Sequence, residues 1–454
     1  MRLPLSAARA LAALALAALA AVLAGCVLDA DGEGSTSRIV PDGTNPCRHG
    51  ELWPHALRSA RHPFVVHYRT ADELSMAAQV VAHLEAAWDF EIGYLGFPPP
   101  LDDGGECGAD GAWDVFIWRG KETCFVQVIH EAVEEKYLVA TPWGGRRSYM
   151  IVDPWGRNGG AILAQTLAHE LNHAAHAAED WYEAGSIFEM TATYVEQYFD
   201  DALDYNIADF QQHPEWAPLW HDDYRTYAMY GSGLYLYFLR DRYFARGGTL
   251  DPTFAARLWH YARNREDRPL VNRPNVVDAF DALLAPVGET YAGSLVPFAR
   301  WRWYAGSRDD GAHFQPWRDL AHGYALLPFL PGAGVRVQKA TLADTTVTID
   351  PPLMLTGTAY VEVTSDRPGR RTFSVALPPP PVPGVKWVLQ AVPGIEAGTD
   401  GEVLDAGAGT VTVEFAGGAG VGTRTLIVTA MPTAPLDPDD RSGERFPLTL
   451  SLRP

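Results

Sequence analysis

Cysteine and positive charge are both scarce in this 454-residue chain. The four cysteines include no Cys-x-x-Cys pair, which argues against a zinc site built from thiolates. The 36 basic side chains are outnumbered by 56 acidic ones, so the net charge is −20, and no basic cluster with interleaved aromatic residues occurs. This balance argues against nucleic acids and anionic membrane surfaces as partners.

The most prominent long apolar run lies at the N-terminus. Arg2 and Arg9 precede a stretch rich in alanine and leucine that ends Leu23-Ala24-Gly25-Cys26, with the length and polarity of an export signal. This ending resembles the bacterial lipobox, which implies cleavage before Cys26 and a lipid on that cysteine. We therefore expect a signal peptide over residues 1–25 and a flexible Gly-, Ser- and Asp-rich tether over residues 26–46. An uncleaved membrane anchor is the alternative, and it would leave the remaining chain on the same side of the membrane.

Three cysteines remain after such cleavage, in a chain expected to reach an oxidising compartment. Cys107 and Cys124 flank a predicted strand, Trp113–Trp118, at a separation typical of a hairpin. This favours a disulfide between them and leaves Cys47 free or paired elsewhere. The other two pairings remain open, because the sequence does not decide between them.

The segment His169-Glu170-Leu171-Asn172-His173 is the feature with the clearest chemical meaning. In a helix, His169 and His173 lie one turn apart on the same face, so both imidazoles can bind one metal ion. Glu170 lies about 100° around the helix from His169, where its carboxylate can reach a water on that ion rather than the ion itself. The alternative is that the two histidines merely line a packed helix.

A catalytic zinc site needs a third protein ligand, and three carboxylates compete for this role. Glu179 stands where the pattern His-Glu-x-x-His-x-x-Gly-x-x-His has its last ligand, but His176 replaces the required glycine. Glu183 lies in a predicted polar turn, where we expect it to be solvated. Glu189 is favoured, because it begins a second helical pattern, residues 186–199, in which Ala192 permits close approach.

The motif followed by Phe188-Glu189-Met190-Thr191-Ala192-Thr193-Tyr194-Val195-Glu196 resembles the gluzincin metallopeptidases, whose third ligand is a glutamate on the next helix. More narrowly, residues 60–305 are similar to a group of secreted bacterial metallopeptidases, through Trp113–Ile117, Ser148–Asp153 and these two motifs. The chain departs from that group at Met190, where glycine is usual, and at Tyr194, where tryptophan is usual. Fifteen residues separate His173 from Glu189, which is short for gluzincins.

The resemblance implies one Zn²⁺ per chain and a role for Glu170 as general base. It also implies a later donor for the oxyanion, for which we favour Tyr230 over Tyr227. Thr193 or Glu196 could hydrogen-bond the outer nitrogen of a ligating histidine, or could be solvated residues on a helix face.

Chain length and a change of sequence period predict two folded domains, of α+β class overall. Residues 47–330 would form a zincin-like domain with a mixed sheet, an active-site helix and a helical second lobe. Its strands are expected at 64–68, 113–118 and 148–153, the last at the sheet edge, and its helices at 71–88, 186–199, 234–243, 252–263, 275–284 and 294–304. Residues 331–454 alternate in polarity and would form a β-sandwich with strands near 335–339, 345–350, 359–364, 372–377, 386–392, 410–415, 425–430 and 447–452.

These features together predict a monomeric, exported, lipid-anchored zinc peptidase of the bacterial cell envelope, at the outer membrane or cell surface in a Gram-negative cell. An endopeptidase acting on protein substrates is favoured, because the Gly-Ala-Met-Glu-Asn segment of many gluzincin aminopeptidases is absent. Two alternatives remain: a surface binding or scaffold lipoprotein that has lost turnover, and hydrolysis of a non-protein amide such as cell-wall peptide.

Overall fold

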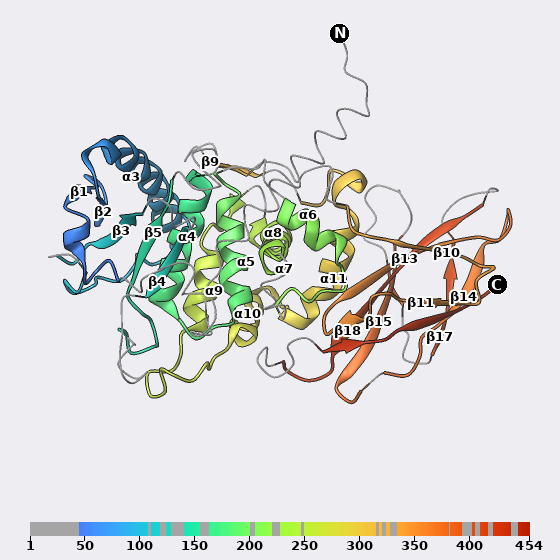
Figure 1. Ribbon diagram of the computed structural model, residues 1–454. Helices are drawn as coiled ribbons and strands as arrows, with labels where there is room; N and C mark the ends of the chain where they lie inside the picture. The colour runs from blue at the N-terminus through green and yellow to red at the C-terminus, as the bar shows by residue number, and fades with distance from the viewer. Residues whose placement is uncertain are drawn as a thin grey trace, which may run out of the picture. The chain divides into compact units, whose positions relative to one another are not determined.

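The computed structural model describes most of the chain from Asn45 onward (Figure 1). The described residues are 45–107, 110–118, 124–128, 140–154, 163–199, 205–219, 228–246, 249–314, 317–319, 324–326, 334–380, 382–392, 402–404, 409–415, 421–436 and 444–454. The predicted signal peptide, Cys26 and the tether up to residue 44 lie outside these ranges and remain predictions. None of the helices within the ranges combines the length and the apolar character needed to cross a bilayer.

The chain combines helices with several β-sheets, which confirms the predicted mixture of α and β structure. Residue contacts divide it into two compact units. The first unit is the chain up to Tyr182 together with Arg263–Val271, and the second consists of Glu183–Ala262 and Asn272–Pro454. The second unit thus includes both a run of helices and the β-rich C-terminal part.

The first unit is built on a five-stranded sheet with the order β1-β2-β3-β5-β4. The strands are β1 (His55–Arg58), β2 (Phe64–Tyr68), β3 (Trp113–Ile117), β4 (Cys124–Val128) and β5 (Ser148–Val152). β2, β3 and β5 run parallel, whereas β1 and β4 pair antiparallel at the two edges. All three predicted strands are confirmed, but the expectation that residues 148–153 form the edge is wrong, because β4 pairs with β5 on its outer side.

Two helices pack on this sheet. α3 (Leu74–Trp88) follows a 3-10 turn in which Thr70 and Glu73 cap each other's backbone N–H groups. α3 packs against β1, β2 and α4 (Leu163–Glu179), and α4 in turn contacts β4 and β5 (Figure 1). As a result, every residue of α4 except Ala164 is buried.

Cys47 forms a disulfide with Cys107, so the predicted pairing of Cys107 with Cys124 is wrong. Both cysteines belong to an apolar cluster that includes Trp53, whose Nε1 donates a 2.9 Å hydrogen bond to the carbonyl oxygen of Ile117. The segment before β1 therefore packs against the sheet next to Cys107. The separation of cysteines along the sequence does not reveal this approach.

The helices of the second unit are α5 (Gly185–Glu196), α6 (Tyr205–Gln212), α7 (Ala228–Gly231), α8 (Gly233–Leu239), α9 (Phe254–Ala262), α10 (Val276–Leu284) and α11 (Tyr291–Trp303). The five helices predicted in this region are confirmed, with differences at their ends. The predicted helix over 234–243, for example, changes to a π-helical turn at Arg240–Phe244. α10 begins where its sequence indicates, because the side chain of Asn275 accepts hydrogen bonds from the N–H groups of Val277 and Asp278.

The C-terminal part contains two sheets that share one hydrophobic core. One sheet has the order β10-β13-β18-β15-β16, and the other has the order β11-β20-β14-β17. Their bounds are β10 (Gln338–Thr341), β11 (Thr346–Thr348), β13 (Thr358–Thr364), β14 (Thr372–Ala376), β15 (Val385–Val392), β16 (Glu402–Leu404), β17 (Thr410–Glu414), β18 (Thr423–Pro432) and β20 (Thr449–Arg453). Val361 and Leu389 of one sheet meet Val375 and Leu450 of the other in this core. This is the arrangement of a β-sandwich, and each of the eight predicted strands has a counterpart, although the first begins at Gln338 rather than at residue 335 and β16 was not predicted.

The turn after α6 joins the sandwich to the helices of the same unit. The N–H group of Arg336 donates a 2.9 Å hydrogen bond to the carbonyl oxygen of Gln211, and that of Thr358 donates a 2.7 Å bond to Pro214. A side chain at Gly357 would place its Cβ 2.1 Å from the carbonyl oxygen of Glu215, so only glycine permits this approach. The sandwich is thus bound to the helices through backbone groups.

Loss of the disulfide should destabilise the first unit. A Cys47→Ser, Cys107→Ser double variant frees a loop with a sequence separation of 60 residues, and we expect the free energy of unfolding to fall by about 2–4 kcal/mol. Denaturant unfolding of oxidised wild type, reduced wild type and the variant measures this. Equal stabilities for all three would contradict it.

Candidate metal centre

α4 brings the two motif histidines together. The ring centroids of His169 and His173 lie 4.6 Å apart with perpendicular planes, and the side chains are 4% and 2% exposed. Glu170, between them, is 1% exposed. The helical placement that the sequence predicts for these three residues is confirmed.

Glu189 of α5 completes a group of candidate metal ligands. It is buried, and one oxygen of its carboxylate and one ring nitrogen of each of His169 and His173 all lie within 4.8 Å of one another. Atoms bound to one ion at about 2 Å can be no farther apart than roughly 4 Å, so small side-chain adjustments suffice to hold a metal. Two imidazoles and a carboxylate form a donor set typical of catalytic zinc.

The two competing carboxylates have other partners. Glu179 forms an ion pair with Arg263. Glu183 accepts a 3.1 Å hydrogen bond from the N–H group of Val276, at the start of α10. Glu183 is 7% exposed, so the expectation that it is solvated is wrong. Its partner lies far along the chain, which explains why no local pattern indicated its burial.

A network of polar contacts holds the C-terminal end of α4. The N–H group of Arg146 donates a 2.6 Å hydrogen bond to the carbonyl oxygen of Ala177, and its guanidinium bonds the hydroxyl of Tyr182 at 2.8 Å. Asp180 accepts hydrogen bonds from the N–H group of Tyr182 and the side chain of Asn264. Burial raises the pKa of Asp180 to about 7, and the neighbouring charge of Glu179 adds to the rise.

One acidic residue near the motif was not indicated by any sequence pattern. Glu91 lies on the π-helical turn that follows α3, η3 (Asp89–Tyr94), and accepts a 2.9 Å hydrogen bond from Asn172 Nδ2. Burial raises the pKa of Glu91 well above its ordinary value, whereas the hydrogen bond from Asn172 and the charge of His169 act in the opposite direction. These residues are 81 positions apart, so no spacing rule could have connected them.

The remaining predicted site residues are buried but are not members of the His169–His173–Glu189 group. Tyr230, on α7, is 6% exposed; Thr193 and Glu196 lie on α5, at 0% and 7%. Thr193 packs where α8 approaches α5, since a Cβ at Gly233 would lie 3.3 Å from Thr193 Cγ2. Their predicted roles stay predictions, and Tyr227 lies outside the described residues.

A second group of potential ligand atoms, from Asp103, Cys107 and Asp114, also lies within 4.8 Å. The sulfur of Cys107 is part of the disulfide and cannot act as a thiolate. Asp114 is bonded to His67 Nε2 at 2.5 Å, and Asp103 accepts bonds from the N–H groups of Gly105 and Cys107. These carboxylates therefore serve the local fold.

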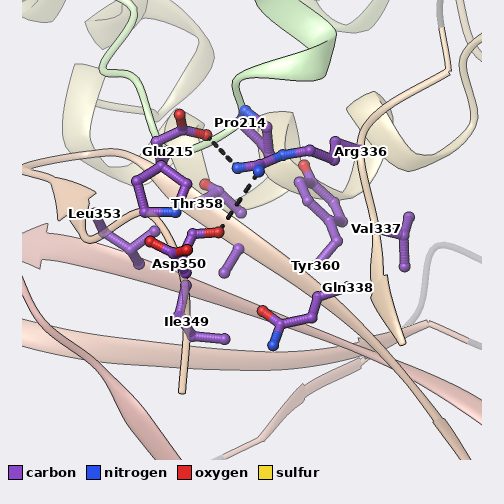
Figure 2. A pocket seen from close by; sticks show the side chains of 12 residues that line it. Pro214, Glu215, Arg336, Val337, Gln338, Ile349, Asp350, Leu353, Thr358 and Tyr360 are labelled. Atoms are coloured by element: carbon purple, nitrogen blue, oxygen red, sulfur yellow. Dashed lines mark hydrogen bonds and ion pairs between the residues drawn. The ribbon is translucent and has the colours of Figure 1, made fainter. Parts of the chain in front are cut away.

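A cavity of about 320 Å³ in the second unit has no lining residue in common with the candidate ligands. Figure 2 shows Arg336 between Glu215 and Asp350, within hydrogen-bond distance of both. Arg336 Nη2 lies 2.8 Å from Glu215 Oε2, so these two charges neutralise each other, and Nη1 bonds the backbone carbonyl of Asp350. The cavity is a feature of the joint between α6 and the sandwich.

A scan against protein-family models finds no match, and a search of curated proteins finds none either.

The buried carboxyl of Asp180 should make stability depend on pH. Its pKa of about 7 in the folded protein lies above its value in the unfolded chain, near 4, so the folded state binds the proton more tightly. The stability that this proton provides is complete below about pH 4 and is lost as pH rises through about 7. We expect Asp180→Asn to abolish this contribution to the fall in the free energy of unfolding between pH 4 and 8. Denaturant unfolding over that pH range measures the effect. Parallel curves for variant and wild type would contradict the expectation.

Proposed function

We propose that this protein is a zinc-dependent peptidase of the gluzincin kind, whose ion is held by His169, His173 and Glu189. The observation that carries this proposal is the buried group of two imidazoles and one carboxylate with ligand atoms within 4.8 Å of one another. Burying three such groups is costly unless something compensates for the lost hydration, and a divalent cation provides that compensation.

A zinc ion bound there would supply Lewis acidity, which polarises a peptide carbonyl and makes water more acidic. Glu170 then acts as general base, since the helix places its carboxylate next to His169 but outside the ligand group. It accepts the proton of the attacking water and returns a proton to the leaving amine. Tyr230 would donate a hydrogen bond to the oxyanion.

The architecture of the first unit supports a zincin-like fold. A sheet of parallel strands with antiparallel edges is covered by α3 and by α4, which carries the motif. We further propose that the protein acts on peptide bonds of extracytoplasmic proteins, as a monomer anchored through lipid on Cys26 in a bacterial cell envelope. The sequence of residues 1–26 supports the export and the anchor.

The second candidate function is a binding or scaffold lipoprotein that retains the metal without turnover. The β-sandwich favours it in one respect, because such a domain offers surface for a partner without a catalytic group. Retention of Glu170 favours hydrolysis, because metal binding alone does not need a base.

Replacement of the base should separate metal binding from turnover. Wild type and Glu170→Gln should each contain about one zinc ion per chain, while cleavage of casein falls by about a hundredfold to ten-thousandfold in the variant. Elemental analysis and a fluorescent casein assay measure the two quantities. Glu179→Gln is the matched control, since it removes a carboxylate from the same helix and should keep both. If wild type holds zinc and cleaves neither casein nor cell-wall peptide, the scaffold function is favoured.

Replacement of the third ligand should weaken metal retention. We expect Glu189→Ala to lose zinc during dialysis against a chelator at concentrations where wild type keeps it, because two imidazoles alone bind the ion less tightly. Glu183→Ala serves as control and should cost stability only, through loss of the bond to Val276. Equal retention in wild type and Glu189→Ala, with loss in Glu183→Ala, would transfer the ligand role to Glu183.

A further inference from the structure

The group of Asp103, Cys107 and Asp114 in the first unit lacks only a free thiol to offer three metal ligands. One potential ligand atom of each residue lies within 4.8 Å of the other two, and the residues are 1%, 0% and 3% exposed. While the sulfur of Cys107 is bonded to Cys47, the two carboxylates serve the local fold. Opening of the disulfide changes the chemistry of the group, because Cys107 then becomes a potential thiolate.

One carboxylate oxygen of this group is left unsatisfied. Asp114 lies on β3, and its Oδ1 is 2.5 Å from His67 Nε2. Asp114 Oδ2 is buried and has no hydrogen-bond partner among the residues that the structure describes. The carboxylate of Asp103 lies close by, and two buried carboxylates repel each other unless a proton or a cation lies between them. A cation bound here would satisfy Asp114 Oδ2 and remove the repulsion.

Contacts other than the disulfide hold the ligand atoms in place. The carboxylate of Asp103 accepts hydrogen bonds from two backbone N–H groups, one of them that of Cys107, at 2.6 and 2.9 Å. The ring of His67 stacks on Phe116 with 4.8 Å between ring centroids, and this fixes the partner of Asp114. We therefore expect the group to keep its arrangement when the disulfide opens.

We propose that reduction of the Cys47–Cys107 disulfide converts this group into a binding site for a thiophilic divalent cation such as Zn²⁺. The ligands are the thiolate of Cys107 and the carboxylates of Asp103 and Asp114, all of which zinc accepts. Zinc binds sulfur at about 2.3 Å and oxygen at about 2.0–2.2 Å, so small side-chain adjustments bring the three atoms onto one ion.

The disulfide and the cation are alternative partners of Cys107. A phosphine reductant breaks the S–S bond, and the two sulfurs take up two electrons and two protons while the phosphine gains an oxygen from water. Binding of the cation then displaces the proton of the Cys107 thiol into solvent. Cys47 is half-buried whereas Cys107 is completely buried, so a reductant reaches the sulfur of Cys47 more easily.

Replacement of Cys47 tests the site without a reductant. Cys47→Ser leaves Cys107 as a thiol, and titration with Co²⁺ should produce the near-ultraviolet charge-transfer band of a thiolate–cobalt bond. Wild type reduced with a phosphine should show the same band. Oxidised wild type and the Cys47→Ser, Cys107→Ser double variant should lack it. Both contain Cys26 and Cys124, so they control for the other thiols. Addition of Zn²⁺ should abolish the band by displacing the cobalt.

The carboxylates are tested in the Cys47→Ser protein. Adding Asp103→Asn or Asp114→Asn should weaken the affinity for Co²⁺ by about tenfold or more, because losing a ligand costs at least as much as losing the partner of a ligand. Asp102→Asn is the matched control. It removes an exposed carboxylate next to Asp103 that is not a member of the group, and it should leave the affinity unchanged.

Three results would overturn the proposal. The first is absence of the band in reduced wild type and in Cys47→Ser when circular dichroism shows both to be folded. The second is a band that neither Asp103→Asn nor Asp114→Asn weakens. The third is loss of the native fold in both reduced wild type and Cys47→Ser, because the group would then not survive opening of the disulfide.

The proposal goes beyond the peptidase function and is independent of it. The His169–His173–Glu189 group contains no sulfur, so it cannot give a thiolate–cobalt band. A wild type that binds no zinc in its oxidised form would reject the peptidase while leaving this second site intact. A Cys47→Ser protein without the band would reject the second site while leaving the first intact.

Discussion

The enclosure of α4 is the constraint on which the candidate site depends. A helix on a protein surface keeps its polar residues in water, whereas α4 buries His169, Glu170, Asn172 and His173 together with its apolar residues. Polar groups without water need partners within the protein or an ion. Glu91 supplies one such partner by accepting a hydrogen bond from Asn172, and the carboxylate of Glu189 lies within 4.8 Å of a ring nitrogen of each histidine, where the proposed cation would bind. At the C-terminal end of the helix, the N–H group of Arg146 bonds the carbonyl oxygen of Ala177, and Arg263 forms an ion pair with Glu179.

Local patterns were sufficient to predict most elements and the candidate ligands. The helical period placed His169 and His173 on one face, and a second helical pattern singled out Glu189 among three carboxylates. The alternation of polarity after residue 331 located eight of the nine strands described in the two sandwich sheets and missed the short strand β16. For the two histidines and for each strand, the relevant residues lie within about one helical turn or one strand of each other, so backbone geometry alone relates them.

Contacts between distant segments could not be predicted in this way. Cys47 reaches Cys107 because the segment before β1 packs against the sheet, and hairpin-like spacing favoured the wrong partner for Cys107. β4 pairs outside β5, so the predicted edge strand is internal. Glu91 reaches Asn172 through the packing of α3 on α4. Sequence spacing carries no information on such approaches, which only the assembled sheet and helices determine.

The contacts between the turn after α6 and the sandwich mean that the C-terminal sheets cannot be removed without exposing groups of the helices. The backbone N–H groups of Arg336 and Thr358 donate hydrogen bonds to carbonyl oxygens of the turn at 211–214. Gly357 has no side chain and therefore leaves room for the backbone of Glu215. A protein truncated before the sandwich would leave the carbonyls of Gln211 and Pro214 without these donors and would strip an apolar layer from α11, whose Trp303 packs on Tyr360. The C-terminal sheets therefore cover apolar and polar groups of these helices, and the helices would need new surface residues to be stable without them.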